Sequence, residues 1–343
     1  MNAHERAAEM RRLQETKSLP TEYSFFRATV EYCYDKIIAC LPAGQRKILE
    51  RSPVVALAVT DVDALIDPIP EIPGEAILIF SYRLFTFLRL VQNAGLWFAT
   101  KSNLADIESL TQLGRLFSEM FAYMASHRQI GVLPHFVVNE PLGSSAMVGC
   151  AASFVSFVLG HEMGHLLQAN GEKDILNVLY RLRIVHPSIE NTMQLEELAS
   201  DQFGLRCVRY VLSDGKQPFG LTAATGPFTA IAYDSALQLL LNLGEGLIRY
   251  RQAAESALRV EQFASDFVKR SHTLSSYPLG DVRMKALSSL VTEFTPRESI
   301  LGELFLKMTV HALWHSNDVS YLTSDFIRKT QIGAWLDDQF RDV

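Results

Sequence analysis

The sequence predicts a mostly α-helical fold of the α+β class, and three observations carry that prediction. From residue 82 almost to residue 343, apolar residues recur at the spacing of amphipathic helices. Short apolar runs compatible with β-strands occur between residues 53 and 81. The sequence lacks alternating strand–helix–strand units, which argues against a doubly wound parallel sheet. We therefore expect one small β region beside a set of helices.

The first 50 residues are expected to form two helical pieces that separate near Leu19-Pro20-Thr21. In the second piece, apolar residues follow helical spacing at Phe26, Val30, Cys33, Ile37 and Cys40. Strands are expected over 54–59 and 76–80, and we expect no other substantial strand. The prolines of 67–70 and the Pro-Gly pair of 73–74 indicate turns between these two strands.

The rest of the chain is expected to be helical and broken by proline- and glycine-containing segments. We expect helices over 82–99, 103–128, 144–170, 191–213, 227–243, 246–273, 281–293, 297–316 and 322–340. This organisation suggests three parts: an N-terminal helical extension (1–50), a core (51–295) and a C-terminal helical segment (296–343).

Composition places the chain among globular proteins, with 48% apolar and 20% charged residues and a mean hydropathy of +0.09. The net charge of −6, without long runs of like charge, argues against nucleic acid as a partner. Four cysteines without a C-x-x-C pair, and an N-terminus without an apolar signal segment, indicate a cytoplasmic protein. A chain of this length folds without a metal, so a metal site would need a functional explanation.

One uncharged stretch, residues 141–160, has the 20-residue length of a membrane span. It contains glycines and serines and continues directly into His161-Glu162. A buried helix that leads into an active site explains the same composition. We expect a soluble protein, and membrane association remains the alternative.

The chemistry of the chain is indicated by His161-Glu162-Met163-Gly164-His165, an H-E-x-x-H motif. On a helix, residues four apart share one face, so both imidazoles can reach one ion. Zn²⁺ accepts imidazole nitrogen and keeps one position open for water in catalytic sites. Glu162 can then act as a general base on that water. Gly164 leaves room beside His165 for another element to approach closely.

A third metal ligand is expected from residues 195–204, where Glu197 and Asp201 again lie four residues apart. Glu197 would complete a His₂Glu site, and Glu196 is the alternative ligand. Asp201 would accept a hydrogen bond from the outer N–H of a ligating histidine and so fix its tautomer. An ordinary exposed helical glutamate is the competing interpretation of Glu197.

These motifs, His161-Glu-x-x-His165 and Glu197-x-x-x-Asp201, resemble the gluzincin zinc metallopeptidases, particularly the HtpX- and Oma-like group with its soluble relatives. Asp63-Ala64 and residues 74–80 resemble the strand region of that group. Tyr277-Pro278-x-x-x-x-Arg283 resembles its His-Pro-x-x-x-x-Arg segment, with Tyr277 in place of His, and Ser200 replaces the usual Ala. The likeness spans about residues 54–290, and a smaller one exists to Lit-type phage-exclusion peptidases.

The resemblance implies a zincin-like metallopeptidase core with one Zn²⁺ per chain and a protein or peptide substrate. Glu162 would deprotonate the zinc-bound water and then protonate the leaving amine. An extended peptide would lie antiparallel along a sheet edge near residues 77–80. Tyr277, Arg283 and His272 are the candidate oxyanion donors, and each also has an ordinary structural interpretation.

Other interpretations stay open at this point. A non-haem Fe(II) site also uses two histidines and a carboxylate, but that class lacks the adjacent glutamate base, so zinc is preferred. The chain could instead be a non-catalytic metal-binding interaction protein, or a membrane-associated peptidase of the same type. His311 and His315 form another i, i+4 pair without a following glutamate, and we interpret them as packing residues.

Overall fold

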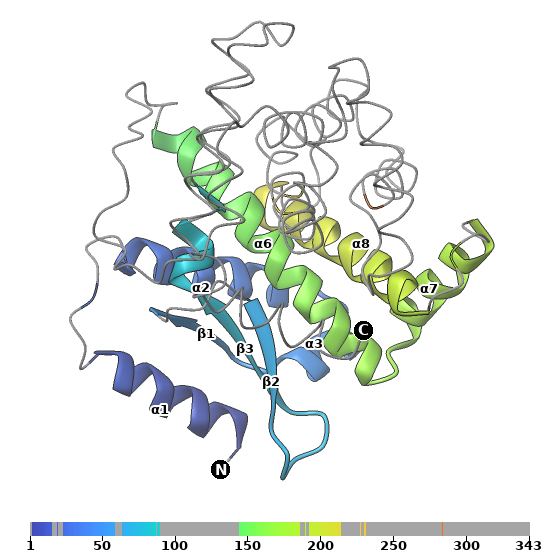
Figure 1. Ribbon diagram of the computed structural model, residues 1–343, viewed down its shortest axis with the longest axis horizontal. Coiled ribbons are helices and arrows are strands. Elements are labelled where there is room, and N and C mark those ends of the chain that lie inside the picture. The colour runs from blue at the N-terminus through green and yellow to red at the C-terminus, as the bar shows by residue number, and fades with distance from the viewer. Residues whose placement is uncertain are drawn as a thin grey trace, which may run out of the picture.

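Figure 1 shows a computed structural model of the chain, in which helices surround a small sheet. The structure describes residues 2–15, 19, 23–58, 64–86, 88–89, 144–185, 189, 192–213, 227, 230 and 283. The helices expected over 103–128, 246–273, 297–316 and 322–340 lie outside these residues, as do His272 and Tyr277. Of the helix expected over 82–99, residues 82–86 and 88–89 are described and helical.

The N-terminal region forms the helices α1 (Ala3–Glu15), α2 (Tyr23–Cys40) and α3 (Ala43–Leu49). The first two confirm the pair of helical pieces that the sequence predicts. In α2 the predicted apolar stripe is fully buried at Phe26, Val30, Cys33 and Ile37. Cys40 is the last residue of α2, as the helical spacing predicts, and it is exposed.

Three strands form one mixed sheet in the order β1-β3-β2: β1 (Val54–Leu57), β2 (Ala64–Pro68) and β3 (Ala76–Ser81). β1 runs parallel to β3, and β2 pairs with β3 as an antiparallel hairpin. The sequence prediction of two strands missed β2 and placed a turn at its end. Pro68 fits there because β2 pairs with one described strand, and proline is tolerated on edge strands.

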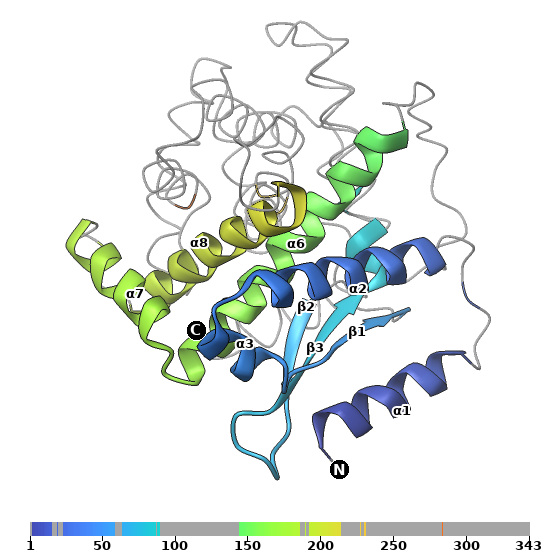
Figure 2. The same cartoon turned by 180° about the vertical axis from the view of Figure 1, so that it is seen from behind.

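Side chains of the sheet alternate between two buried faces, as the period of two along a strand requires. Ala56, Leu78 and Phe80 belong to the main core, which α2, α6 and α8 complete. Val55 and Ile77 face the other way and meet Ala3 and Ala7 of α1 in a smaller cluster. The sheet therefore lies between α1 and the remaining helices, as the two opposite views show (Figures 1 and 2).

Three helices follow: α6 (Ser144–Ala169), α7 (Lys173–Val185) and α8 (Thr192–Ser213). α6 and α8 confirm the helices expected over 144–170 and 191–213, whereas α7 was not predicted. α6 ends at Ala169, and Gly171 follows with a φ of 68° and a backbone N–H that donates to the carbonyl of Gln168, which is typical of a glycine after a helix terminus. The middle of α6 is buried in the protein core, and this burial accounts for the absence of charged residues there. Among the described residues, none of the helices is long and apolar enough to cross a membrane.

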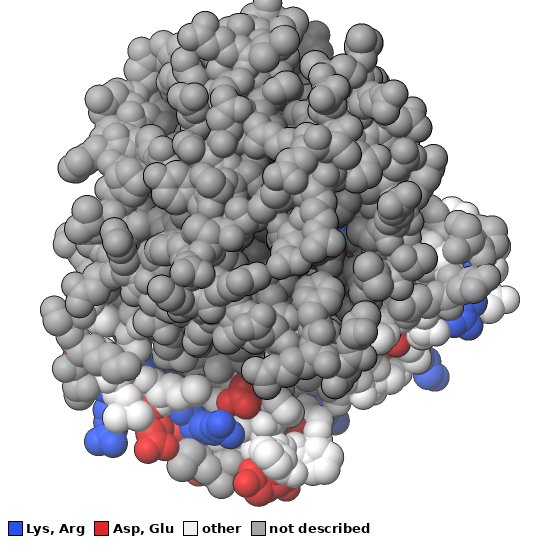
Figure 3. Space-filling view, in the orientation of Figure 1, with Lys and Arg blue, Asp and Glu red and all other residues white. Residues whose placement is uncertain are grey.

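The described surface carries charges of both signs. Figure 3 shows Lys and Arg interspersed with Asp and Glu along the described part of one face, without a large patch of one sign there. One ion pair on the described surface joins Arg6 of α1 to Asp67 of β2 at 3.0 Å.

Candidate metal centre

The centre is built where α6 crosses α8 at very short distance, and small residues make this approach feasible. A Cβ atom added to Gly164 would lie 2.9 Å from the Cα of Ser200, and one added to Gly160 would lie 2.8 Å from the Cα of Gly204. Real Cβ atoms essentially never come so close. The sequence expectation that Gly164 admits a neighbouring element is confirmed, and the neighbour is α8. The helices therefore face each other nearly backbone to backbone.

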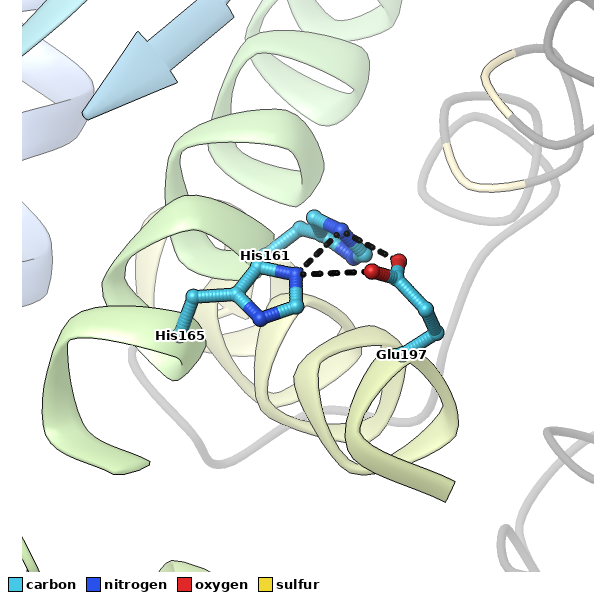
Figure 4. A group of neighbouring side chains, drawn as sticks. All are labelled: His161, His165 and Glu197. Atoms are coloured by element: carbon cyan, nitrogen blue, oxygen red, sulfur yellow. Dashed lines mark hydrogen bonds and ion pairs between the residues drawn. The ribbon is translucent and has the colours of Figure 1, made fainter. Parts of the chain in front are cut away.

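Three potential ligand side chains converge in this crossing: His161 and His165 from α6, and Glu197 from α8 (Figure 4). Nε2 of His161 lies 3.1 Å from Nε2 of His165. The carboxylate of Glu197 places one oxygen 3.2 Å from His161 Nε2 and the other 3.4 Å from His165 Nε2. This group could hold a metal ion, and the sequence-predicted triad is thus brought together in space.

The spacing of these atoms fits a small tetrahedral cation. Ligands about 2.05 Å from a Zn²⁺ ion at tetrahedral angles are about 3.3 Å apart. The Nε2–Nε2 distance of 3.1 Å is close to this value, and so is the distance from each ring to a carboxylate oxygen, which is a different oxygen for each ring. One oxygen of Glu197 (Oε2) is buried and accepts no hydrogen bond, although His161 lies 3.2 Å away. Such an unsatisfied oxygen is costly unless a proton donor or a cation completes it. The donor set of two imidazoles and one carboxylate matches the ligands that zinc uses in hydrolases.

Asp201 and Arg283 hold His161 from behind. Asp201 accepts a hydrogen bond from Nδ1 of His161 at 3.0 Å, so the proton that metal binding displaces is the one on Nε2, which faces the centre. Arg283 donates two hydrogen bonds to the Asp201 carboxylate, both 2.6 Å long. Asp201 is fully buried and Arg283 is 5% exposed. His161 is therefore oriented by a buried ion pair, as a ligating histidine commonly is.

The electrostatics of the centre favour positive charge between the ligands. Burial alone would lower the pKa of His161, but the hydrogen bond to Asp201 and the nearby Glu197 raise that pKa to about 10. Burial would raise the pKa of Glu197, yet its contacts with His161 and His165 hold that pKa well below its usual range. Burial would also raise the pKa of Asp201, but the charge of Arg283 lowers that pKa below its ordinary value. Both carboxylates are thus ionised, and they attract a cation.

A second contact between α6 and α8 fixes the segment that carries Glu197. Gln168, one turn beyond His165, donates hydrogen bonds to the backbone carbonyl of Glu196 at 3.0 Å and to the hydroxyl of Ser200 at 2.9 Å. Ser200 is fully buried, and its hydroxyl is useful here because an alanine could not accept this bond. Sequence reasoning missed this role of Gln168. A signal was present, because small residues four apart at 160 and 164, and again at 200 and 204, are typical of two helices that pack closely.

The remaining sequence-predicted site residues have different outcomes. Glu162 is half-buried on α6 directly after His161. Glu196 is not part of the metal-binding group found among the described residues, whereas Glu197 is. The structure places the guanidinium of Arg283 on Asp201, and its oxyanion contact stays a prediction. The edge prediction near residues 77–80 is wrong, because β3 is the central strand and has a partner on each side.

Comparisons with known proteins add no family assignment. No family model matches the chain, and neither curated proteins nor solved structures give a significant match. The case for function therefore depends on the chemistry of the centre itself.

Proposed function

We propose that the protein is a zinc-dependent endopeptidase, with the metal held by His161, His165 and Glu197. The convergence of these three side chains, two from α6 and one from α8, carries the proposal. When bound, Zn²⁺ would polarise the scissile carbonyl and lower the pKa of water toward neutrality. The gluzincin-like order of motifs in the sequence supports the same activity.

In this proposal Glu162 is the general base. It follows His161 on α6, so its side chain leaves the helix about 100° further round the axis. From there it would take a proton from the attacking water and pass it to the leaving amine. The exposed fractions of the ligand side chains are 12% for His161 and Glu197 and 26% for His165, so in this proposal solvent and substrate enter from the side of His165.

An extended peptide is the substrate conformation that the sheet supports best. β2 pairs with β3 on one side, and the described residues place no strand on its other side. A peptide backbone could therefore add to β2 rather than to the central β3. Asp201 and Arg283 would act as positioning residues, because they hold the ring of His161 in the ligating orientation.

The test is a metal analysis combined with a peptide-library cleavage profile of the full chain and its Glu162→Gln variant. We expect one zinc per chain in both, with cleavage only in the wild type. Glu196→Gln is the matched control, because it changes the neighbouring glutamate on α8 and should leave both zinc and cleavage intact. Zinc with no cleavage of any library by the wild type would favour the non-catalytic metal-binding protein. Loss of zinc binding in Glu196→Gln would show that Glu196, and not Glu197, is the third ligand.

A further inference from the structure

A separate pocket of about 210 Å³ lies between α3, α7 and α8. Its lining residues on α8 include Gln202 and Arg206. Arg206 follows Glu197 by nine residues, which is about two and a half helical turns. The pocket therefore opens on the face of α8 opposite to the metal centre, and the proposed peptidase chemistry does not use it.

The pocket carries a local excess of positive charge. Arg181 of α7 and Arg206 and Arg209 of α8 line it, and Asp174 is the one carboxylate among its described lining residues. The three cations and one anion among these described residues give a formal charge of +2, in a chain whose net charge is −6. A concave site of this sign attracts anions.

Arg206 is held in place by neutral groups. Its guanidinium carbon lies 5.5 Å from the ring centroid of Phe203 and 5.9 Å from that of Tyr210. Its Nε donates to the Tyr210 hydroxyl at 2.8 Å, and one terminal nitrogen donates to the side-chain carbonyl of Gln45 at 3.5 Å. Among the described residues no carboxylate is paired with Arg206, so its charge is positioned but not neutralised. A planar, preoriented guanidinium of this kind suits a carboxylate or a phosphate.

The rest of the described lining indicates that the bound anion also has an apolar group. Ile175, Val178 and Phe203 supply apolar surface. The volume exceeds the roughly 150 Å³ of an engineered cavity that holds benzene, and it is smaller than a typical drug-sized site.

We propose that this pocket binds a small organic anion the size of an N-acyl amino acid. Its carboxylate contacts Arg206, and its apolar side chain packs against the apolar lining formed by Ile175, Val178 and Phe203. The C-terminal residue of a short peptide and a free N-acyl amino acid share this chemistry.

The test is a ligand-observed NMR titration of the full chain with N-acetyl-L-leucine. N-acetyl-L-leucine methyl ester, which lacks the charge, and inorganic phosphate, which lacks the apolar group, are the comparison probes. We expect the carboxylate to bind at millimolar concentration or below and at least about tenfold more tightly than the ester. A C-terminal leucine dipeptide, N-acetyl-Ala-Leu, separates the two sources, because a peptide-end site binds it more tightly still. Equal binding of the ester or of phosphate, or no binding of any probe, would overturn the proposal.

Variants connect binding to the pocket. Arg206→Met should weaken binding of N-acetyl-L-leucine at least about tenfold, because it removes the guanidinium charge and keeps an unbranched side chain that covers the stem of Arg206. Arg181→Gln, at an exposed position, should weaken it less and gives an independent test if Arg206→Met fails to fold. Arg183→Gln is the control, because Arg183 is exposed on α7, bonds to Thr192 and does not line the pocket. Unchanged affinity in both pocket variants would show that the anion binds elsewhere.

Discussion

Gly164→Ala probes the helix crossing that creates the metal centre. The added Cβ would lie 2.9 Å from the Cα of Ser200, and ordinary contact begins at 3.4 Å. Because the obstructing atom belongs to the backbone, no side-chain rotation relieves the clash. α6 and α8 must then move apart locally by about 0.5 Å, the difference between these distances. Metal–ligand distances in real sites lie within about 0.2 Å of their ideal values, so a shift of about 0.5 Å would leave Glu197 poorly placed to bind the ion.

We expect Gly164→Ala to weaken zinc binding by about 10–100-fold, comparable with the loss of a residue that orients a ligand. Overpacking should also lower the free energy of unfolding of the metal-free protein by about 1–3 kcal/mol. Competition titration against a chromophoric chelator measures the first effect, and urea unfolding measures the second. Gly44→Ala in α3 is the matched control, because its Cβ would meet nothing within 4 Å. Zinc affinity within about twofold of the wild type in Gly164→Ala would refute the close-crossing argument.

Three further predictions concern the centre and the core. Asp201→Asn should weaken zinc about 10–100-fold in a competition titration and, by leaving Arg283 buried without a carboxylate, lower the unfolding free energy by about 3–5 kcal/mol. An unchanged zinc affinity would contradict the orienting role. Removing zinc with a chelator should lower the Tm of the wild type, by the equivalent of about 2.7 kcal/mol when zinc is at 100 times its Kd, but not that of His165→Ala. An equal loss in both proteins would exclude this site as the cause. Tyr34→Phe should lower the free energy of unfolding by about 1 kcal/mol in urea unfolding, because the half-buried hydroxyl donates to the carbonyl oxygens of Leu49 and Ser52, each 3.1 Å away. An unchanged free energy of unfolding would contradict a stabilising role of the Tyr34 hydroxyl.

The centre itself could be predicted from the sequence because its chemistry is local to two helices. His161 and His165 lie one turn apart, and so do Glu197 and Asp201, so helix geometry alone puts each pair on one face. The distance between the pairs could not be predicted, since it depends on the Gly164–Ser200 approach. Arg283 and Asp201 are 82 residues apart in the sequence, so their contact depends on the tertiary fold and could not be predicted from local patterns.

The errors in the fold have equally specific causes. α7 was missed although Ile175, Val178 and Leu182 follow a helical period, so the signal was present in the sequence. β2 is short, and its end at Pro68 looks like a turn when the partner strand is unknown. The central place of β3 depends on pairing with β1 across a chain crossover, which period-two alternation does not reveal.

Zinc K-edge X-ray absorption, on the wild type and on Glu197→Ala, examines the metal assignment at the level of its ligands. The account predicts one zinc per wild-type chain with two imidazole nitrogens at about 2.0–2.1 Å and a carboxylate oxygen beside them, and the loss of that oxygen in Glu197→Ala. A wild-type chain that binds no stoichiometric zinc, or a spectrum that Glu197→Ala leaves unchanged, would contradict it.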